Sequence, residues 1–329
     1  MKFMQIEPPK ARGVLHESMW ESSEWVAEEK YDGDRRIAQF CDGGRVRFTG
    51  TRVSVGDGLF VEKTANIPHL SLPKAEVVHL DPYPTVRTHM LTGTVLDGEI
   101  VAPRGEHVAG GQSKLVTAIM GSKPEEAIRK QQIRGWLGYV VFDCLFYKGE
   151  DIRMLPYVKR RVYVIRALGE WGNPWVQPAH QFAGSRMKEA FEAIVEAGGE
   201  GVVLKYDAGL YGDQKAWVKV KGQWTADVVV MGYTSGEGKY KGQIGAVRFG
   251  QYPRRVASES ITLTECGQCS GMDDALRLEL THNGKKYMGK VMEIMHNGRE
   301  PTGAFRHPRF KRWRDDKRPA DCIYREGET

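Results

Sequence analysis

Apolar and alternating segments along the first two thirds of the chain predict a mixture of strands and helices. Two segments, 157–171 and 186–197, have apolar residues at helical spacing, and Gly198 offers a C-terminal stop for the second. Short apolar or alternating runs predict strands, which we place at 25–29, 35–40, 46–49, 94–101, 139–146 and 201–206. This order of elements predicts an α+β domain.

The pattern changes near Ala226, where the long helical stripes end. Short strands at 227–233, 245–249 and 290–295 are separated by glycine-rich turns. About 100 residues of this kind suit a small all-β barrel such as an OB-fold. We therefore expect two domains, at residues 1–222 and 223–329.

Composition is that of a globular protein with a mild excess of positive charge. Of the 329 residues, 41% are hydrophobic and 27% charged, and the net charge is +6. The seven basic residues between Arg306 and Arg318 face only two acidic ones, which suits a polyanionic partner or a solvated face. No apolar run is long enough for a membrane helix, and the start lacks the apolar core of a signal peptide, so we expect a cytoplasmic protein.

Five cysteines in a chain of this length do not suggest a disulfide framework. Cys266 and Cys269 have CxxC spacing, but no second cysteine or histidine pair lies near them to complete four zinc ligands. We expect two ordinary thiols.

The segment from Lys30 to Arg35 (KYDGDR) places a lysine, a carboxylate, a glycine and an arginine between two predicted strands. A lysine held there becomes a nucleophile if neighbouring cations or burial lower its pKa. Taken alone, the segment also fits a surface hairpin with a salt bridge.

Four more polar motifs follow in the chain, each in or beside a predicted strand: DGE at 97–99, FD at 142–143, EGVVLK at 200–205 and WVKVK at 217–221. Strand alternation places Lys219 and Lys221 of the last motif on one face. Two ammonium groups spaced in this way are able to grip neighbouring phosphates.

This ordered set, with Thr51-Arg52 and an RxDK element at 314–317, resembles the nucleotidyltransferase superfamily of ATP-dependent DNA ligases and mRNA capping enzymes. The combination of EGVVLK with WVKVK is most similar to the small ATP-dependent DNA ligases of phages, viruses and bacteria. The resemblance implies a nucleotidyltransferase domain of ATP-grasp-like antiparallel sheets with helices, followed by an OB-fold domain that binds DNA.

The resemblance also implies a three-step reaction. Lys30 attacks the α-phosphate of ATP, and the resulting lysine–AMP passes its AMP to the 5′-phosphate of a DNA nick. The 3′-OH of the nick then attacks and releases AMP. ATP and Mg²⁺ (or Mn²⁺) are the implied cofactors, and nicked duplex DNA is the implied partner of a monomeric, minimal enzyme of a bacterial or phage-infected cell.

Roles follow for individual residues by matching motifs. Lys30, Asp32, Arg35, Lys219 and Lys221 are the implied catalytic set, with Asp32 near the 3′-OH. Glu200 and Glu99 are implied metal ligands, and Glu99 also holds the ribose. Phe142 matches the adenine-stacking ring better than Tyr139 does. The implied nucleotide-binding set is Glu29, Lys30, Arg35, Arg52, Glu99, Phe142, Lys205, Lys219, Lys221, Arg314 and Lys317. The implied DNA contacts are Arg35, Arg52, Arg309, Lys311 and Arg312.

Other functions share parts of this pattern. A capping guanylyltransferase would use the same lysine to form lysyl-GMP, and an RNA ligase is a weaker match because of the RxDK end. A non-catalytic OB-type nucleic-acid binder with a decayed transferase domain would bind DNA without forming covalent AMP. The presence of Lys30, Glu99, Glu200, Lys219 and Lys221 argues against decay.

Overall fold

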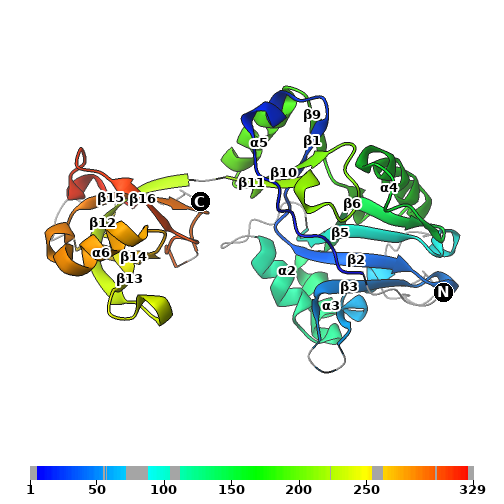
Figure 1. Cartoon of the computed structure of the whole chain (residues 1–329). Coiled ribbons are helices and arrows are strands. Elements are labelled where there is room, and N and C mark those ends of the chain that lie inside the picture. Colours follow the sequence, from blue (N-terminus) through cyan, green and yellow to red (C-terminus); the bar gives the residue numbers. More distant parts are fainter. Residues whose placement is uncertain are drawn as a thin grey trace. The chain divides into compact units, whose positions relative to one another are not determined.

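A computed structural model describes residues 6–54, 56, 58–71, 88–103, 112–222, 224–253, 262–300 and 302–324. The chain divides into two compact units, Met1–Lys221 and Gly222–Thr329 (Figure 1). The division falls one residue before the boundary expected from the sequence. The two units are described separately below.

The first unit contains a four-stranded antiparallel sheet in the order β11-β10-β1-β9. Its strands are β1 (Trp25–Glu29), β9 (Gln181–Ala183), β10 (Gly201–Tyr206) and β11 (Trp217–Lys221). Helix α5 (Arg186–Glu196) covers one face of this sheet (Figure 1). Its apolar stripe packs Met187, Phe191 and Ile194 against Trp20 and the strand valines.

A larger, seven-stranded sheet completes the first unit. Its strands run in the order β4-β3-β2-β5-β6-β7, and β8 pairs with β6 in parallel while the other pairs are antiparallel. They are β2 (Asp34–Phe40), β3 (Val46–Val53), β4 (Phe60–Glu62), β5 (Val95–Val101), β6 (Gly138–Tyr147), β7 (Glu150–Asp151) and β8 (Val176–Pro178). The helices of this part are α1 (Pro68–Ser71), α2 (Gln112–Met120), α3 (Pro124–Arg134) and α4 (Tyr157–Trp171).

Helix α4 packs on β6 and closes the main core of the first unit (Figure 1). Val164, Ala167 and Trp171 point into that core, and the Trp171 ring meets Phe40 edge-on at 4.8 Å between centroids. The helix ends at Gly172, which takes a left-handed conformation with φ of 65°. The core therefore fixes β2, β5 and β6, the strands that carry the sequence motifs.

The second unit is a five-stranded antiparallel sheet in the order β14-β13-β12-β15-β16. The strands are β12 (Trp224–Ser235), β13 (Ile244–Gln251), β14 (Thr264–Cys269), β15 (Val291–His296) and β16 (Arg309–Trp313). One helix, α6 (Asp274–Asn283), accompanies them. Its N-cap Asp273 accepts a hydrogen bond from the Leu276 N–H at 2.7 Å.

The two CxxC thiols are core residues of the second unit. Cys266 and Cys269 are buried beside Phe249, and burial raises the pKa of Cys269 to about 12. In the described ranges, no group of three or more His, Cys, Asp or Glu residues gathers as a metal site. These thiols pack as small apolar side chains.

The expected α+β class is confirmed, and each strand and helix expected from the sequence is present. The sequence analysis made β12 too short, and it did not anticipate the helices α1, α2, α3 and α6 or the strands β4, β7, β8, β9, β14 and β16. In α6, Leu276, Leu278 and Leu280 alternate with polar residues as they would in a strand, so periodicity concealed the helix. None of the helices in the described ranges is long and apolar enough to cross a membrane.

Candidate active site

Lys30 lies where the chain crosses from the four-stranded to the seven-stranded sheet. Its backbone N–H donates to the Gly201 carbonyl at 2.8 Å, at the end of the β1–β10 pairing. Three residues later, a Cβ on Gly33 would lie 2.0 Å from the Ile100 carbonyl oxygen of β5. Only glycine fits at position 33, and its absence of a side chain lets the backbone pack closely on β5. The segment is thus held at Lys30 by the four-stranded sheet and at Gly33 by the seven-stranded sheet.

Two lysines share the carboxylate of Glu200. Lys30 Nζ pairs with one oxygen of Glu200, and Lys221 Nζ lies 2.6 Å from the other. Burial alone would raise the pKa of Glu200, but the two ammonium groups hold it below its usual value. Lys219 extends from the same strand as Lys221, and burial together with its cationic neighbours lowers its pKa. The KxK pattern thus places its cations beside Lys30.

Arg35 is fixed by a two-point pair with Asp97. Arg35 Nε lies 3.0 Å from Asp97 Oδ1, and Arg35 Nη2 lies 2.5 Å from Oδ2. Tyr211 donates to the same carboxylate at 2.8 Å. The guanidinium also lies 5.3 Å from the centroid of the Phe142 ring and 5.4 Å from that of Trp217. Burial opposes the charge of Arg35, yet Asp97 raises its pKa above the usual value.

Glu99 is opposite Arg35 in the β2–β5 register. Burial raises its pKa to about 8, against the opposing effects of Lys30 and Arg35. At neutral pH this carboxyl group therefore carries a proton, so it is able to donate a hydrogen bond to a hydroxyl group.

The two candidate stacking rings of β6 differ in exposure. Tyr139 is fully buried, with its hydroxyl donating to the Arg36 carbonyl at 2.9 Å and its ring edge-on to Phe48 at 5.2 Å between centroids. Phe142 is only partly buried and lies beside Arg35. Tyr139 has no free face for a base, whereas Phe142 has some open surface.

A buried acid that sequence reasoning missed pairs with Lys205, a lysine that lies beside the Phe142 ring. Glu28 of β1 accepts hydrogen bonds from Tyr157, from Gln181 at 3.0 Å and from Lys205 Nζ at 2.6 Å. Lys205 Nζ also donates to the Phe142 carbonyl at 3.0 Å and lies 4.7 Å from the centroid of its ring. The expected nucleotide contact of Lys205 is thus a fully buried ammonium group that supports Phe142. The sequence held one signal that could have revealed Glu28, namely a carboxylate inside the short strand β1.

A second buried pair lies behind the FD motif. Arg160 of α4 contacts both oxygens of Asp143, at 2.8 and 2.9 Å, and both side chains are fully buried. Arg160 also donates to the carbonyls of Leu155 and Gly209. The pair joins α4 to β6 and fixes the strand on which Phe142 sits.

Asp32 and Glu29, two further expected site residues, contact groups other than the three lysines. Asp32 accepts from the Ser113 N–H of α2 at 3.3 Å. Glu29 lies at the end of β1, near Tyr31. Burial raises the pKa of the Tyr31 hydroxyl, and the negative charge of Glu29 raises it further. The side chain of Arg52 lies outside the described residues.

The five expected basic residues of the second unit lie on and after β16. Lys311 Nζ and Arg312 Nε pair with the two oxygens of Glu293, at 3.0 and 2.6 Å. These partners hold the pKa of Glu293 at about 2, although burial acts in the opposite direction. Arg309 is exposed and forms no ion pair within the described ranges.

Arg314 and Lys317 of the RxDK element share another carboxylate. Arg314 Nη1 lies 2.9 Å from Asp227 Oδ1, and Lys317 Nζ lies 3.7 Å from Asp227 Oδ2. Sequence analysis did not identify Asp227 as a site residue. The three valines that follow it predict a strand, and nothing in the local sequence indicates a partner for its carboxylate.

Two DNA ligases are similar to this chain in sequence. A DNA ligase of Saccharolobus solfataricus is 27% identical over 287 residues, which is 69% of this chain and 45% of that protein, and one of Saccharolobus shibatae is 28% identical over the same shares. The chain therefore spans about half the length of these curated relatives. For the fold alone, a Lig E DNA ligase structure matches with a TM-score of 0.61 at 18% identity, covering 94% of this chain and all of that chain.

The ligase domain of Mycobacterium tuberculosis LigD has the same fold, with a TM-score of 0.50 at 20% identity over 99% of this chain and 100% of that chain. The family model for the ATP-dependent DNA ligase domain matches residues 12–221, which include Lys30, Glu99, Phe142, Glu200 and Lys221. Because this match covers more than half of the sequence, the chain belongs to the ATP-dependent DNA ligase domain family.

Proposed function

We propose that this chain is a DNA ligase that uses ATP to seal nicks with a 5′-phosphate and a 3′-OH in duplex DNA, in replication, repair and recombination. The observation that carries the proposal is the joint contact of Lys30 and Lys221 with Glu200, beside Lys219. A nucleophilic amine, a carboxylate and additional cations then surround one point, as transfer of a nucleotide to a lysine requires.

In the first step, Lys30 gives up a proton to solvent and its nitrogen bonds to the α-phosphorus of ATP. The bond from that phosphorus to the bridging oxygen breaks, and pyrophosphate leaves with the electron pair. Lys219 and Lys221 offer positive charge to the phosphate oxygens, and Phe142 offers a ring face to the adenine, a contact worth about 1–3 kcal/mol. Glu99, neutral at pH 7, is suited to donate to a ribose hydroxyl.

Glu200 is suited to hold Mg²⁺. Its carboxylate is charged, partly exposed and already faces two cations, and Mg²⁺ in phosphate chemistry commonly uses one or two carboxylates together with substrate oxygens. When bound, the ion would neutralise charge on the phosphate oxygens. Glu99 fits that role less well, because a carboxyl group with a pKa of about 8 is protonated at neutral pH.

In the later steps, AMP passes to the 5′-phosphate of the nick, and the 3′-OH attacks that phosphorus to release AMP. A guanidinium has five N–H donors, and three of those on Arg35 contact Asp97 and the Pro9 carbonyl. The other two, one on each terminal nitrogen, are available to a phosphate. Asp32 lies near enough in sequence to share this part of the site.

The test is covalent labelling with radiolabelled ATP or GTP and Mg²⁺, followed by a denaturing gel and by joining of a labelled nicked duplex. We expect AMP, not GMP, on the wild-type chain and none on Lys30→Ala. Lys30→Arg should also fail, because arginine stays protonated. Lys215→Ala, which removes an exposed lysine, should label normally.

Each alternative gives a different result in this experiment. Covalent GMP would indicate a capping guanylyltransferase. Binding of nicked DNA without any covalent nucleotide would indicate a non-catalytic binder. Labelled AMP on Lys30→Ala would place the nucleophile elsewhere in the chain.

A further inference from the structure

The candidate active site takes its groups from both sheets of the first unit, with the four-stranded sheet above the seven-stranded one in the view of Figure 1. Glu200 directly precedes β10 and Lys221 ends β11, whereas Glu99 belongs to β5 of the other sheet. Lys30, on the crossing between the sheets, pairs with Glu200. Burial raises the pKa of Glu99 and the charge of Lys30 acts against this rise, so Lys30 also lies close to the second sheet. The spacing of the two sheets therefore decides whether these groups meet.

Lys205 of β10 links the two sheets. Its Nζ lies 2.6 Å from a carboxylate oxygen of Glu28 on the neighbouring strand β1, and it donates to the Phe142 carbonyl of β6 at 3.0 Å. The side chain of Lys205 is 2% exposed and that of Glu28 is 3% exposed, so water does not compete for either contact. One buried ammonium group thus holds a strand from each sheet.

Three aromatic rings from three elements enclose the same ammonium group. Lys205 Nζ lies 4.4 Å from the ring centroid of Trp217, 4.6 Å from that of Tyr157 and 4.7 Å from that of Phe142. These rings come from β11, α4 and β6. Tyr157 also donates to Glu28, and its helix α4 packs on β6. Elements of both sheets therefore close around a single positive charge.

The strength of an ion pair does not explain why charges are kept at this position. The cost of removing two ions from water offsets most of their attraction, and replacing both with apolar groups of similar volume is often neutral or stabilising. An ammonium group, however, has three N–H donors, which form hydrogen bonds of defined direction. An apolar pair would fill the same space without fixing where β10 lies relative to β6. Position explains the pair better than stability does.

We propose that Lys205 is a positioning residue that, through Glu28 and the Phe142 carbonyl, sets the spacing between the two sheets and so the distance from Lys30 and Glu200 to the groups of the seven-stranded sheet. This inference rests on the proposed function, which gives the groups of both sheets one shared reaction. It assigns Lys205 a role in the interior of the unit, in place of the direct nucleotide contact that its motif implies.

The test separates position from stability by removing the charges one at a time and together. Lys205→Met keeps a long apolar side chain but leaves Glu28 buried without its main counter-charge, so it should lower the thermal midpoint of unfolding. Lys205→Met combined with Glu28→Gln removes that unpaired charge, and the amide oxygen is still able to accept from Tyr157. We expect the double variant to recover most of the lost midpoint. If the single variant does not fold, the double variant carries the comparison.

The rate of lysyl-AMP formation should not recover together with the midpoint. At saturating ATP and Mg²⁺, we expect the rate to stay at least about tenfold below that of the wild type in both variants, because a displacement of about 1 Å between reacting groups costs about 100-fold. The ATP concentration must be saturating, since a loss that disappears at high ATP would mean that Lys205 or Glu28 contacts the nucleotide itself.

Distances between two spin labels measure the spacing of the sheets without any reaction. One label is placed at Glu192 of α5, which packs on the four-stranded sheet, and the other at Gln132 of α3, which packs on the core of the seven-stranded sheet. Both positions are exposed. Cys41 is the one cysteine that is not buried, so every sample carries Cys41→Ser. We expect a shifted or broader distance distribution in both Lys205 variants than in the wild type.

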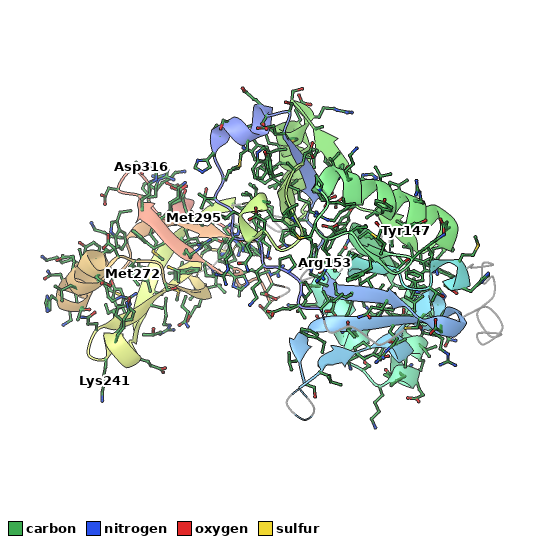
Figure 2. All side chains as sticks on the ribbon, turned by 45° about the vertical axis from the view of Figure 1, so that its right-hand side comes forward. Tyr147, Arg153, Lys241, Met272, Met295 and Asp316 are labelled. Atoms are coloured by element: carbon green, nitrogen blue, oxygen red, sulfur yellow. The ribbon has the colours of Figure 1, made fainter. Side chains whose placement is uncertain are left out.

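Arg153 provides the matched control (Figure 2). Its Nη2 lies 2.6 Å from Asp151 of β7, at the edge of the seven-stranded sheet, and the two side chains are 42% and 43% exposed. Arg153→Met therefore removes a cation from an ion pair of the same unit but leaves Lys205 and Glu28 in place. The midpoint and the label distance should stay near those of the wild type, and the rate should stay within about twofold.

Three outcomes would overturn the inference: a wild-type rate in the double variant, label distances that do not change, or a loss of rate that disappears at high ATP. Failure of the proposed function looks different, because the wild-type chain itself would then form no lysyl-AMP. The label distances would in that case still show whether Lys205 sets the spacing of the sheets.

Discussion

Arg35 of β2 reaches diagonally to Asp97 of β5 and pairs with it through two parallel contacts, of 3.0 and 2.5 Å. Asp97 is fully buried, whereas the Arg35 side chain is 21% exposed. The buried acid therefore orients an arginine whose remaining donors reach the site. A lysine at position 35 would supply the charge but not the two-point geometry.

We predict that Asp97→Asn destabilises the first unit by about 3 kcal/mol, because it leaves the Arg35 guanidinium without its buried counter-charge. Chemical denaturation measures this cost. Arg47 and Glu62 offer a control, since both side chains of that pair are more than a third exposed. Glu62→Gln should cost less than about 1 kcal/mol. Equal costs in the two variants would mean that burial of Asp97 does not strengthen its pair.

We predict that Glu200→Ala slows lysyl-AMP formation by at least about tenfold while the fold is retained, because charge neutralisation at the phosphates depends on this carboxylate. The measurement is the adenylylation rate across a magnesium titration, with circular dichroism as the check on folding. Glu196→Ala, at the exposed end of α5, is the control. Wild-type rates in Glu200→Ala at every magnesium concentration would remove Glu200 from the metal role.

We predict that binding of a non-hydrolysable ATP analogue weakens as the pH rises through about 8. Burial raises the pKa of Glu99 from 4.5 to about 8, so its protonated form predominates below that pH and is lost above it. The same shift makes the contribution of Glu99 to folding stability greatest below pH 4.5 and lost as the pH passes through about 8. Glu99→Gln, which keeps a neutral donor, should bind with a flatter pH profile. An unchanged profile would assign the titration to another group.

Elements and sites were predictable to different degrees, for physical reasons. Lys30, Glu200 and Lys221 could be grouped from motifs, since each lies at one end of a strand whose pattern is clear. Glu28 could not be paired with Lys205, because partners on adjacent strands that are far apart in sequence leave no local signal. The burial of Arg160 could not be predicted, because in the sequence it is an ordinary polar residue of a helix. It is buried against Asp143 only because α4 packs on β6.

We predict that nick joining weakens with salt more steeply than lysyl-AMP formation does, because DNA releases counterions with a slope of about −0.9 per phosphate contacted. Neutralising Arg309, Lys311 and Arg312 together should reduce that slope and weaken nick binding while largely keeping adenylylation. The salt slope should fall by less than the amount expected for three lost phosphate contacts, because Glu293 already offsets part of the charge of Lys311 and Arg312. Binding measured by fluorescence anisotropy over a salt series gives the slope.

The matched control for this variant neutralises three exposed lysines elsewhere in the second unit, Lys241, Lys285 and Lys286. It removes the same total charge. If both triple variants lose affinity equally, net charge and not the segment after His307 determines binding. If neither loses affinity, DNA is held by another face.

The short crossing from Lys30 to Gly33 has a consequence for how the sequence of this chain is able to change. Hydrogen bonding to Gly201 fixes one end, and close packing on Ile100 fixes the other. An inserted residue would pull one of these two anchors out of place, and loss of the Gly201 contact would move the ammonium group off Glu200, so insertions here should reduce lysyl-AMP formation. The number of residues between Lys30 and Gly33, more than their identity, therefore determines where the Lys30 ammonium group lies relative to Glu200.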